Sequence, residues 1–219
     1  LKDIEKFLLY YEMLVEWNGF MNLTAITEYD EVMKKHFIDS LSLIKAYDLS
    51  QEKKVIDIGT GAGFPGLVLK IAFPQLEITL LDSLNKRIQF LDAVIQNLSL
   101  TGVETVHGRA EDFAKPEKLR ECFDLAVSRA VSNLSTLSEY CLPFVKQGGY
   151  FISYKSEKIS EETEAAKNAI TLLGGKIRRQ IDFTLPDSDI YRNFLLIEKV
   201  TATPKKYPRK AGLPSKEPL

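Results

Sequence analysis

The fold is decided by the stretch VIDIGTGAGFPG, residues 55–66. Its first four positions form a short, largely β-branched run, which is typical of a buried strand in a parallel sheet. Glycines at every second position from Gly59 to Gly63 remove the Cβ atoms, so the backbone can adopt positive φ and a ligand can approach it closely. Pro65 suits the first position of a helix, where no N–H is needed. The stretch therefore predicts a strand, a ligand-binding glycine turn and a helix whose free N–H groups face the turn.

The glycines fit two ligand-binding patterns, which leaves the ligand open at this point. Gly61-x-Gly63-x-x-Gly66, with Asp82 following at the expected distance, matches the dinucleotide fingerprint. The alternative phase, Asp57-x-Gly59-x-Gly61-x-Gly63, resembles the S-adenosylmethionine loop of methyltransferases. A tight strand-to-helix turn without any ligand is the third interpretation.

Length and composition are those of an ordinary globular protein. The 219 residues are 45% hydrophobic and 27% charged, enough for one domain with a small appendage. No run of eighteen apolar residues is present, so we expect no membrane span. The first residues mix acidic and basic side chains, so we expect no signal peptide. Cys122 and Cys141 lack metal-ligand spacing, which predicts reduced thiols, no metal and a cytoplasmic location.

The charge is unevenly distributed along the chain. Residues 201–219 contain five cations and one acid, a charge of +4, whereas the whole chain has −1 and residues 1–200 therefore carry −5. The basic C-terminal stretch favours a nucleic-acid partner. Its four prolines and lack of apolar periodicity predict an extended arm.

The N-terminal fifty residues predict two helices. Apolar side chains recur at helical spacing over residues 1–18, with Gly19 expected as the C-cap. A second helix is predicted from Thr27 to about residue 47, with Asp30 completing a capping-box start. His36 and Asp39 share one face of it, three residues apart, and are predicted to form a hydrogen-bonded pair. A structural pair is favoured over a chemical role, but both remain open.

The remaining pattern alternates strands and helices, which predicts a parallel sheet. Strands are predicted at 54–58, 77–82, 103–107, 123–128 and 150–154, and helices at 65–73, 85–99, 132–141 and 158–173, with a polar turn at 108–112. Two last strands, near 176–184 and 193–199, have no room for a crossover helix and must be antiparallel. This ending resembles the class I methyltransferase fold, a Rossmann-like α/β sheet. The predicted parts are an N-terminal helical extension (1–50), a methyltransferase domain (51–200) and a basic arm (201–219).

Side chains at the carboxyl ends of the first three predicted strands suit S-adenosylmethionine. The turn 59–63 allows close approach to its amino-acid end, Asp82 suits the ribose diol, and Ala110-Glu111 suits the adenine. Arg129, after the fourth strand, is a candidate for guanine O6, a phosphate or the cofactor carboxylate. The chain lacks an Asn/Asp-Pro-Pro-aromatic turn, a Pro-Cys nucleophile and an obvious general base. That combination favours an acceptor with a free lone pair, such as a purine ring nitrogen.

Several motifs, in order, resemble the RsmG family, also called glucose-inhibited division protein B. They are WN at 17–18, NLTA at 22–25, HFIDSL at 36–41, DIGTGAGFPG at 57–66, DS at 82–83, RAE at 109–111, SRAV at 128–131 and KKYPR at 205–209. The resemblance implies methylation of guanine N7 in small-subunit (16S) ribosomal RNA, in a loop near the decoding centre. It also implies cofactor contacts at Gly59, Phe64, Asp82, Ser83, Leu84, Ala110, Glu111 and Arg129, to which the turn itself adds Gly61 and Gly63. No catalytic residue is implied, so Arg129, His36 and Asp39 stay candidates.

The expected partner is the small ribosomal subunit, with the protein a monomer. Candidate RNA-binding residues are Lys155, Lys205, Lys206, Tyr207, Arg209 and Lys210, in which cations neutralise phosphates and the tyrosine stacks on a base. A solvated, disordered end explains the same charges. We expect deletion of residues 203–219 to weaken RNA binding and to spare cofactor affinity. Two alternatives remain: a methyltransferase acting on another RNA or a small molecule, and a non-enzymatic RNA-binding module.

Overall fold

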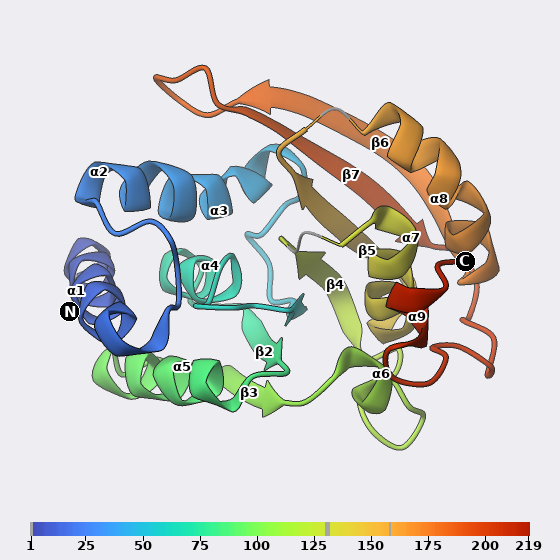
Figure 1. The fold of residues 1–219 in the computed structure, drawn as a ribbon, viewed down its shortest axis with the longest axis horizontal. Helices are drawn as coiled ribbons and strands as arrows, with labels where there is room; N and C mark the ends of the chain where they lie inside the picture. Colours follow the sequence, from blue (N-terminus) through green and yellow to red (C-terminus); the bar gives the residue numbers. More distant parts are fainter. Residues whose placement is uncertain (1, 130–131, 158) are drawn as a thin grey trace.

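The computed structural model describes residues 2–129, 132–157 and 159–219, and its centre is a seven-stranded sheet of order β3-β2-β1-β4-β5-β7-β6 (Figure 1). The strands are β1 (Lys54–Ile58), β2 (Glu77–Asp82), β3 (Val103–His107), β4 (Phe123–Ser128), β5 (Val145–Lys155), β6 (Gly175–Thr184) and β7 (Tyr191–Lys199). The first five run parallel, and β7 pairs antiparallel with both β5 and β6. The predicted parallel sheet with a terminal hairpin is confirmed.

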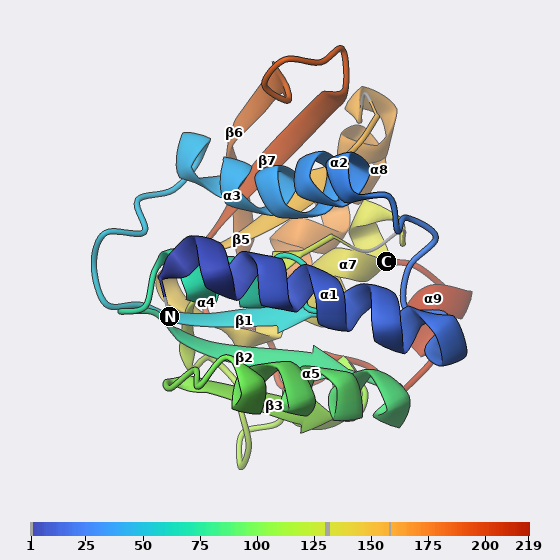
Figure 2. The ribbon, with the colours of Figure 1, turned by 90° about the vertical axis from the view of Figure 1, so that its left-hand side faces the viewer.

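Helices cover both faces of this sheet (Figures 1 and 2). α1 (Asp3–Met21), α4 (Gly66–Ala72) and α5 (Asn85–Asn97) lie on one face, and α7 (Leu134–Cys141) and α8 (Ser160–Leu172) on the other. Successive strand residues point to opposite layers. Val55 accordingly packs in one buried apolar cluster, and its neighbour Ile56 in the other. A strand buried on both faces explains the continuous apolar run of β1.

The N-terminal helices differ from the prediction at their boundaries. α1 continues through Gly19 to Met21, because Asn22, rather than Gly19, adopts the left-handed conformation that ends it (φ 50°). The second helical run starts at Tyr29 after Glu28, without a side-chain cap, so the predicted Thr27–Asp30 capping box is wrong.

The second run is not a uniform α-helix. It passes from α2 (Tyr29–Val32) through a π-helix (Met33–Ile38) to α3 (Asp39–Leu41) and ends in a 3₁₀ turn (Ser42–Lys45). π-Helical turns are rare, and those that occur are often found at functional sites. This one carries His36, and α3 begins at Asp39.

Several further boundaries depart from the prediction. β5 begins at Val145 rather than at the predicted residue 150. Pro65 is the N-cap of α4, not its first residue. The predicted polar turn after β3 contains a short helix, α6 (Ala110–Phe113), and a 3₁₀ turn follows α7 at Leu142–Phe144. Ala130 and Val131 of the SRAV motif, and residue 158 at the predicted start of a helix, lie outside the described residues.

The predicted extended arm is wrong, because the C-terminal residues fold back onto the domain. They end in a short helix, α9 (Leu213–Lys216), beside α7 (Figure 1). Tyr207 and Pro214 are buried. The arm thus docks through a few isolated apolar side chains, which give no periodic pattern in the sequence. The three-part division at residues 50 and 200 stays a prediction.

The start of α4 is packed too tightly for any side chain at residue 66. A Cβ atom on Gly66 would lie 2.3 Å from Cδ2 of Leu80 and 2.9 Å from Oδ2 of Asp57, whereas one on Gly19 would meet nothing within 4 Å. We expect Gly66→Ala to lower the free energy of unfolding by about 1–3 kcal/mol through overpacking. The control Gly19→Ala, inside α1, should raise it by about 0.5–1 kcal/mol. Urea unfolding measures both, and a Gly66→Ala variant as stable as the wild type would contradict this packing.

Candidate functional site

Asp57, at the end of β1, ties the two ends of the glycine turn together. Its Oδ2 accepts hydrogen bonds from Oγ1 of Thr60 (2.7 Å) and from the N–H of Gly66 (2.8 Å). Complete burial raises the pKa of Asp57 to about 6, although these two bonds lower it. Within the described part of the chain its Oδ1 has no hydrogen-bond partner. The turn is therefore held in one shape over a buried carboxyl group.

The turn leaves open space above its backbone. Gly59 and Gly61 have φ of 69° and 62°, values that favour glycine. A Cβ atom on Gly61 would meet nothing within 4 Å. Gly63 differs, since its Cβ would lie 2.5 Å from the hydroxyl oxygen of Tyr10. Gly61 therefore leaves room for a ligand, and Gly63 leaves room for packing against α1.

Asp82 connects this turn to the end of β2. Its carboxylate is 2% exposed and accepts hydrogen bonds from the N–H groups of Gly61 and Leu84, both at 2.9 Å. Nη1 of Arg87 lies 3.2 Å from its Oδ2. The carboxylate thus organises the backbone on both sides of the cavity that follows.

A cavity of about 410 Å³ opens at the carboxyl ends of β1, β2 and β3. Five of the predicted cofactor-binding residues line it, namely Gly59, Asp82, Ser83, Ala110 and Glu111. Lining residues that the sequence did not indicate include Arg87, Tyr140, Gly212 and Ser215. Gly61, Gly63, Phe64, Leu84 and Arg129 are not among the residues that line it. The cavity therefore brings together the predicted ribose and adenine contacts, with additions from α7 and the C-terminal residues.

Arg129 lies instead in a cluster beside the π-helix. Its Nη1 donates to Oδ2 of Asp39 (3.1 Å), and its Nη2 lies 3.1 Å from Nδ1 of His36. Nε of Arg192, on β7, donates to the other carboxylate oxygen of Asp39 at 2.9 Å. The predicted hydrogen bond between His36 and Asp39 is therefore wrong for the described residues, because each of the two side chains bonds Arg129 instead. Arg192 was missed because it is 153 residues from Asp39 and no local pattern marks it.

The imidazole of His36 is neutral. Burial first, and then the charge of Arg129, lower its pKa to about 4. A guanidinium has only donors, so Nδ1 of His36 accepts from Arg129 and Nε2 carries the proton toward Oγ1 of Thr24, 2.9 Å away. The ring stacks on Phe64 with centroids 4.4 Å apart. His36 is therefore an oriented, uncharged partner of Arg129 and packs against the glycine turn.

This environment predicts a pH effect. The folded pKa of His36 lies below the unfolded value of about 6.5, so its contribution to stability is complete above pH 6.5 and is lost as pH falls toward 4. We expect an NMR titration to give a midpoint near 4 for His36, with an upward shift in Arg129→Ala. The signal is assigned by its loss in His36→Gln. A wild-type midpoint at or above 6.5 would contradict the neutral imidazole.

A second cavity, of about 530 Å³, surrounds this cluster. His36, Asp39, Arg129 and Arg192 line it, as does Lys155, at the end of β5. Nζ of Lys155 donates to Oε1 of Glu162 at 2.8 Å. Four cations thus line this cavity, because Lys35 lies there as well.

The remaining RNA-binding candidates are divided by the structure. Lys205, Lys206 and Lys210 are exposed. Tyr207 is only 6% exposed, and Arg209 is paired with Glu139 at 2.7 Å. A buried ring does not suit base stacking, and the guanidinium of Arg209 is held by the buried Glu139 and does not line the second cavity. In the docked arm, therefore, only the lysines fit the role that the charge pattern predicted.

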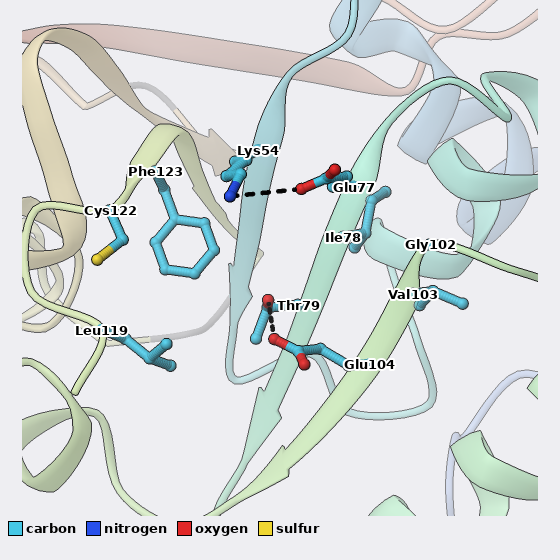
Figure 3. A pocket seen from close by; sticks show the side chains of 10 residues that line it. All are labelled: Lys54, Glu77, Ile78, Thr79, Gly102, Val103, Glu104, Leu119, Cys122 and Phe123. Carbon is cyan, nitrogen blue, oxygen red and sulfur yellow. Dashed lines mark hydrogen bonds and ion pairs between the residues drawn. The ribbon is translucent and has the colours of Figure 1, made fainter.

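A third cavity, of about 500 Å³, lies at the opposite end of the sheet (Figure 3). Its charged side chains bond other residues of the cavity: Lys54 lies 3.6 Å from Glu77, and Thr79 donates to Glu104 at 2.9 Å. It lies beside the amino ends of β1 and β2, whereas open α/β sheets bind ligands at carboxyl ends.

Across the described ranges, no group of three or more His, Cys, Asp or Glu side chains is placed to hold a metal ion. No described helix is long and apolar enough to cross a bilayer.

The sheet order, the glycine turn after β1 and the acid ending β2 together define a class I S-adenosylmethionine-dependent methyltransferase. A S-adenosylmethionine-dependent methyltransferase from Aquifex aeolicus has a TM-score of 0.57 at 17% identity, covering 79% of this chain and 94% of its own. M. jannaschii TYW2, solved in complex with AdoMet, has a TM-score of 0.56 at 15% identity, covering 69% and 71%. At these identities the likeness establishes the fold alone.

The chain belongs to the rRNA small subunit methyltransferase G family, whose model matches residues 3–189. It is 56% identical to the Ribosomal RNA small subunit methyltransferase G of Lachnoclostridium phytofermentans over 217 residues, covering 99% of this chain and 90% of the relative. The protein of the same name from Clostridium novyi is 51% identical over 218 residues, covering 100% and 90%. The family resemblance predicted from the motifs is confirmed.

The residues present fit the cofactor that this class of fold uses. Open space above Gly61 admits a ligand to the backbone, and the buried Oδ1 of Asp57, which bonds none of the described residues, belongs to the same turn. The cavity beside the turn contains two carboxylates, Asp82 and Glu111, as expected for a ligand with a diol and a base edge. Phe64 and Arg129 contribute to the neighbouring cluster instead.

Proposed function

We propose that this protein transfers the methyl group of S-adenosylmethionine to N7 of a guanine in small-subunit (16S) ribosomal RNA, in the loop near the decoding centre. Membership of the rRNA small subunit methyltransferase G family supports the reaction and the RNA. The observation that carries the proposal is the pair of cavities at adjacent strand ends. The first contains Asp82 and Glu111, suited to the cofactor, beside two arginines. The second contains four cations, suited to RNA, beside three acids.

The two cavities lie at the ends of neighbouring strands, β1 and β4, where the strand order changes direction. Oγ of Ser128, at the end of β4, donates to the carbonyl oxygen of Ile58, at the end of β1, at 2.9 Å. Ile58 lines the first cavity, and Arg129, next to Ser128, lines the second. Such a switch point is the ordinary ligand-binding position in open α/β sheets.

Bound S-adenosylmethionine supplies an activated methyl group on a sulfonium. N7 of guanine carries a free lone pair, so no side chain has to remove a proton. The neutral imidazole of His36, already hydrogen-bonded, is therefore not needed as a base. The protein's task is then to hold donor and acceptor in line. Arg129, fixed by Asp39, is positioned to donate to guanine O6 or to a phosphate. Lys155 and the exposed lysines of the arm add phosphate contacts.

We infer that the protein acts in the cytoplasm, where small subunits are assembled, and that it acts as a monomer. The target guanine has to be splayed from its neighbours to reach the methyl group, as is general for enzymes that modify a stacked base.

Methyl transfer to small-subunit particles tests the proposal. Particles lacking the modification are incubated with the protein and methyl-labelled S-adenosylmethionine, and the RNA is digested and analysed by mass spectrometry. We expect label in 7-methylguanosine at one position of the small-subunit RNA. Label at another atom or on another molecule, or no transfer while the cofactor binds, would overturn the proposed reaction.

A further inference from the structure

The C-terminal residues are fastened to the domain by buried charged groups. Glu139, on α7, is 0% exposed and accepts three kinds of donor from Arg209: the backbone N–H (2.7 Å), Nε (3.0 Å) and Nη2 (2.7 Å). Nη1 of Arg120 donates to the carbonyl oxygen of Tyr207 at 2.8 Å, and its Nη2 donates to that of Thr203 at 2.5 Å. A buried carboxylate needs its partner, so this segment has one defined docking position.

That docking position places the segment beside the cofactor cavity. Gly212 and Ser215 line the cavity together with Tyr140. The N–H of Gly212 donates to Oε1 of Glu111 at 2.8 Å, and Oγ1 of Thr136 donates to the carbonyl oxygen of Pro214 at 2.9 Å. Gly212 reaches Glu111 with φ of 83°, a conformation that favours glycine. The hydrogen bond therefore joins the segment to the acid predicted to face the adenine.

The side chains between the segment and the cavity are also linked. Burial and the charge of Glu111 raise the pKa of Tyr140, while a hydrogen bond with Ser215 lowers it. Tyr140 is adjacent in sequence to Glu139, which holds Arg209. Two adjacent residues of α7 thus contact both Arg209, which holds the segment, and Ser215, which lines the cavity.

We propose that residues 209–215 form the outer wall of the adenosine end of the cofactor site, so that arm docking and cofactor binding stabilise each other. This inference rests on the proposed function, because it assumes that S-adenosylmethionine occupies the cavity. Linkage makes the effect reciprocal: whatever factor the docked arm adds to cofactor affinity, the cofactor adds to arm docking. It reverses the expectation that deletion of residues 203–219 spares cofactor affinity.

Calorimetry with S-adenosylmethionine on wild type, Arg209→Ala and the control Arg179→Ala tests the proposal. Arg179 is an exposed arginine on β6, so its variant loses the same charge without touching the arm. We expect the Kd to rise about tenfold in Arg209→Ala and to stay within twofold in Arg179→Ala. Equal affinity in the two variants would overturn the inference and leave the proposed function standing. A wild type that does not bind would overturn both.

Hydrogen exchange on the wild-type protein keeps the test decisive if Arg209→Ala fails to fold, since that variant leaves the Glu139 carboxylate buried without its partner. Peptides that cover residues 209–215 should exchange several-fold more slowly with saturating S-adenosylmethionine, because the Gly212 N–H is part of the site wall. Peptides from β6, at the far edge of the sheet, serve as the internal control. Slowed exchange in the segment supports the wall, whereas exchange unchanged by bound cofactor would show that the arm only packs.

Discussion

Replacement of Asp82 by alanine is expected to weaken S-adenosylmethionine binding by about 1–3 kcal/mol, the cost of a lost charge-assisted hydrogen bond. The proposed role of the carboxylate is to accept from the ribose hydroxyls. It also holds the N–H groups of Gly61 and Leu84 in place at 2.9 Å, so its removal loosens the backbone on both sides of the cavity. Both effects act in the same direction. Calorimetry at constant ionic strength measures the change.

The control for this prediction is Asp92→Ala, which removes an exposed acid on α5 outside the cavity. It should bind the cofactor like the wild type. Thermal unfolding of Asp82→Ala, with and without ligand, separates lost binding from lost folding. Wild-type cofactor affinity in folded Asp82→Ala would remove the carboxylate from the binding site.

For Arg129→Ala we expect turnover on small-subunit particles to fall by about 100-fold, a loss typical of removing one positioned donor from an active site. The cofactor Kd should change by less than about threefold, because Arg129 lies with His36 and Asp39 in the second cavity and does not line the first. Arg129→Lys should recover little, since an ammonium cannot reproduce a guanidinium that spans two partners.

Arg179→Ala is again the matched control and should keep wild-type turnover. Single-turnover methyl transfer and calorimetry, run on the same preparations, separate the acceptor side from the cofactor side. Turnover at the wild-type rate would exclude Arg129 from the reaction. A parallel loss of cofactor affinity would instead support the contact with cofactor that the family resemblance implied.

The sheet was predictable because each strand carries a local signal. β1 to β4 have the predicted bounds, since β1, β2 and β4 are short, mainly apolar runs and β3 is a short β-branched stretch, each between turn-forming residues. The helix ends were less predictable. Asn22 and Glu28 end and begin helices without the expected caps, and the π-helix at Met33–Ile38 has no periodicity that distinguishes it from an α-helix.

The site was predictable only where it follows strand ends. Gly59, Asp82 and Glu111 came together because parallel strands end at one edge of the sheet. Arg192 and Gly212 reach the two cavities through the terminal hairpin and the docked arm, from 153 and 101 residues away from their partners. The arm has charge without hydrophobic periodicity, and the buried acid that holds it, Glu139, sits inside a helix where acids are usually exposed. Pairings of this kind depend on tertiary packing and leave no local pattern.

We propose that the open glycine turn and the acids beside it bind a sulfonium methyl donor. Calorimetry of the wild-type protein with S-adenosylmethionine, and separately with NAD, tests it most directly, since both ligands suit a glycine turn after a parallel strand. We predict saturable one-to-one binding of S-adenosylmethionine and none of NAD. Binding of NAD without binding of S-adenosylmethionine would contradict the account.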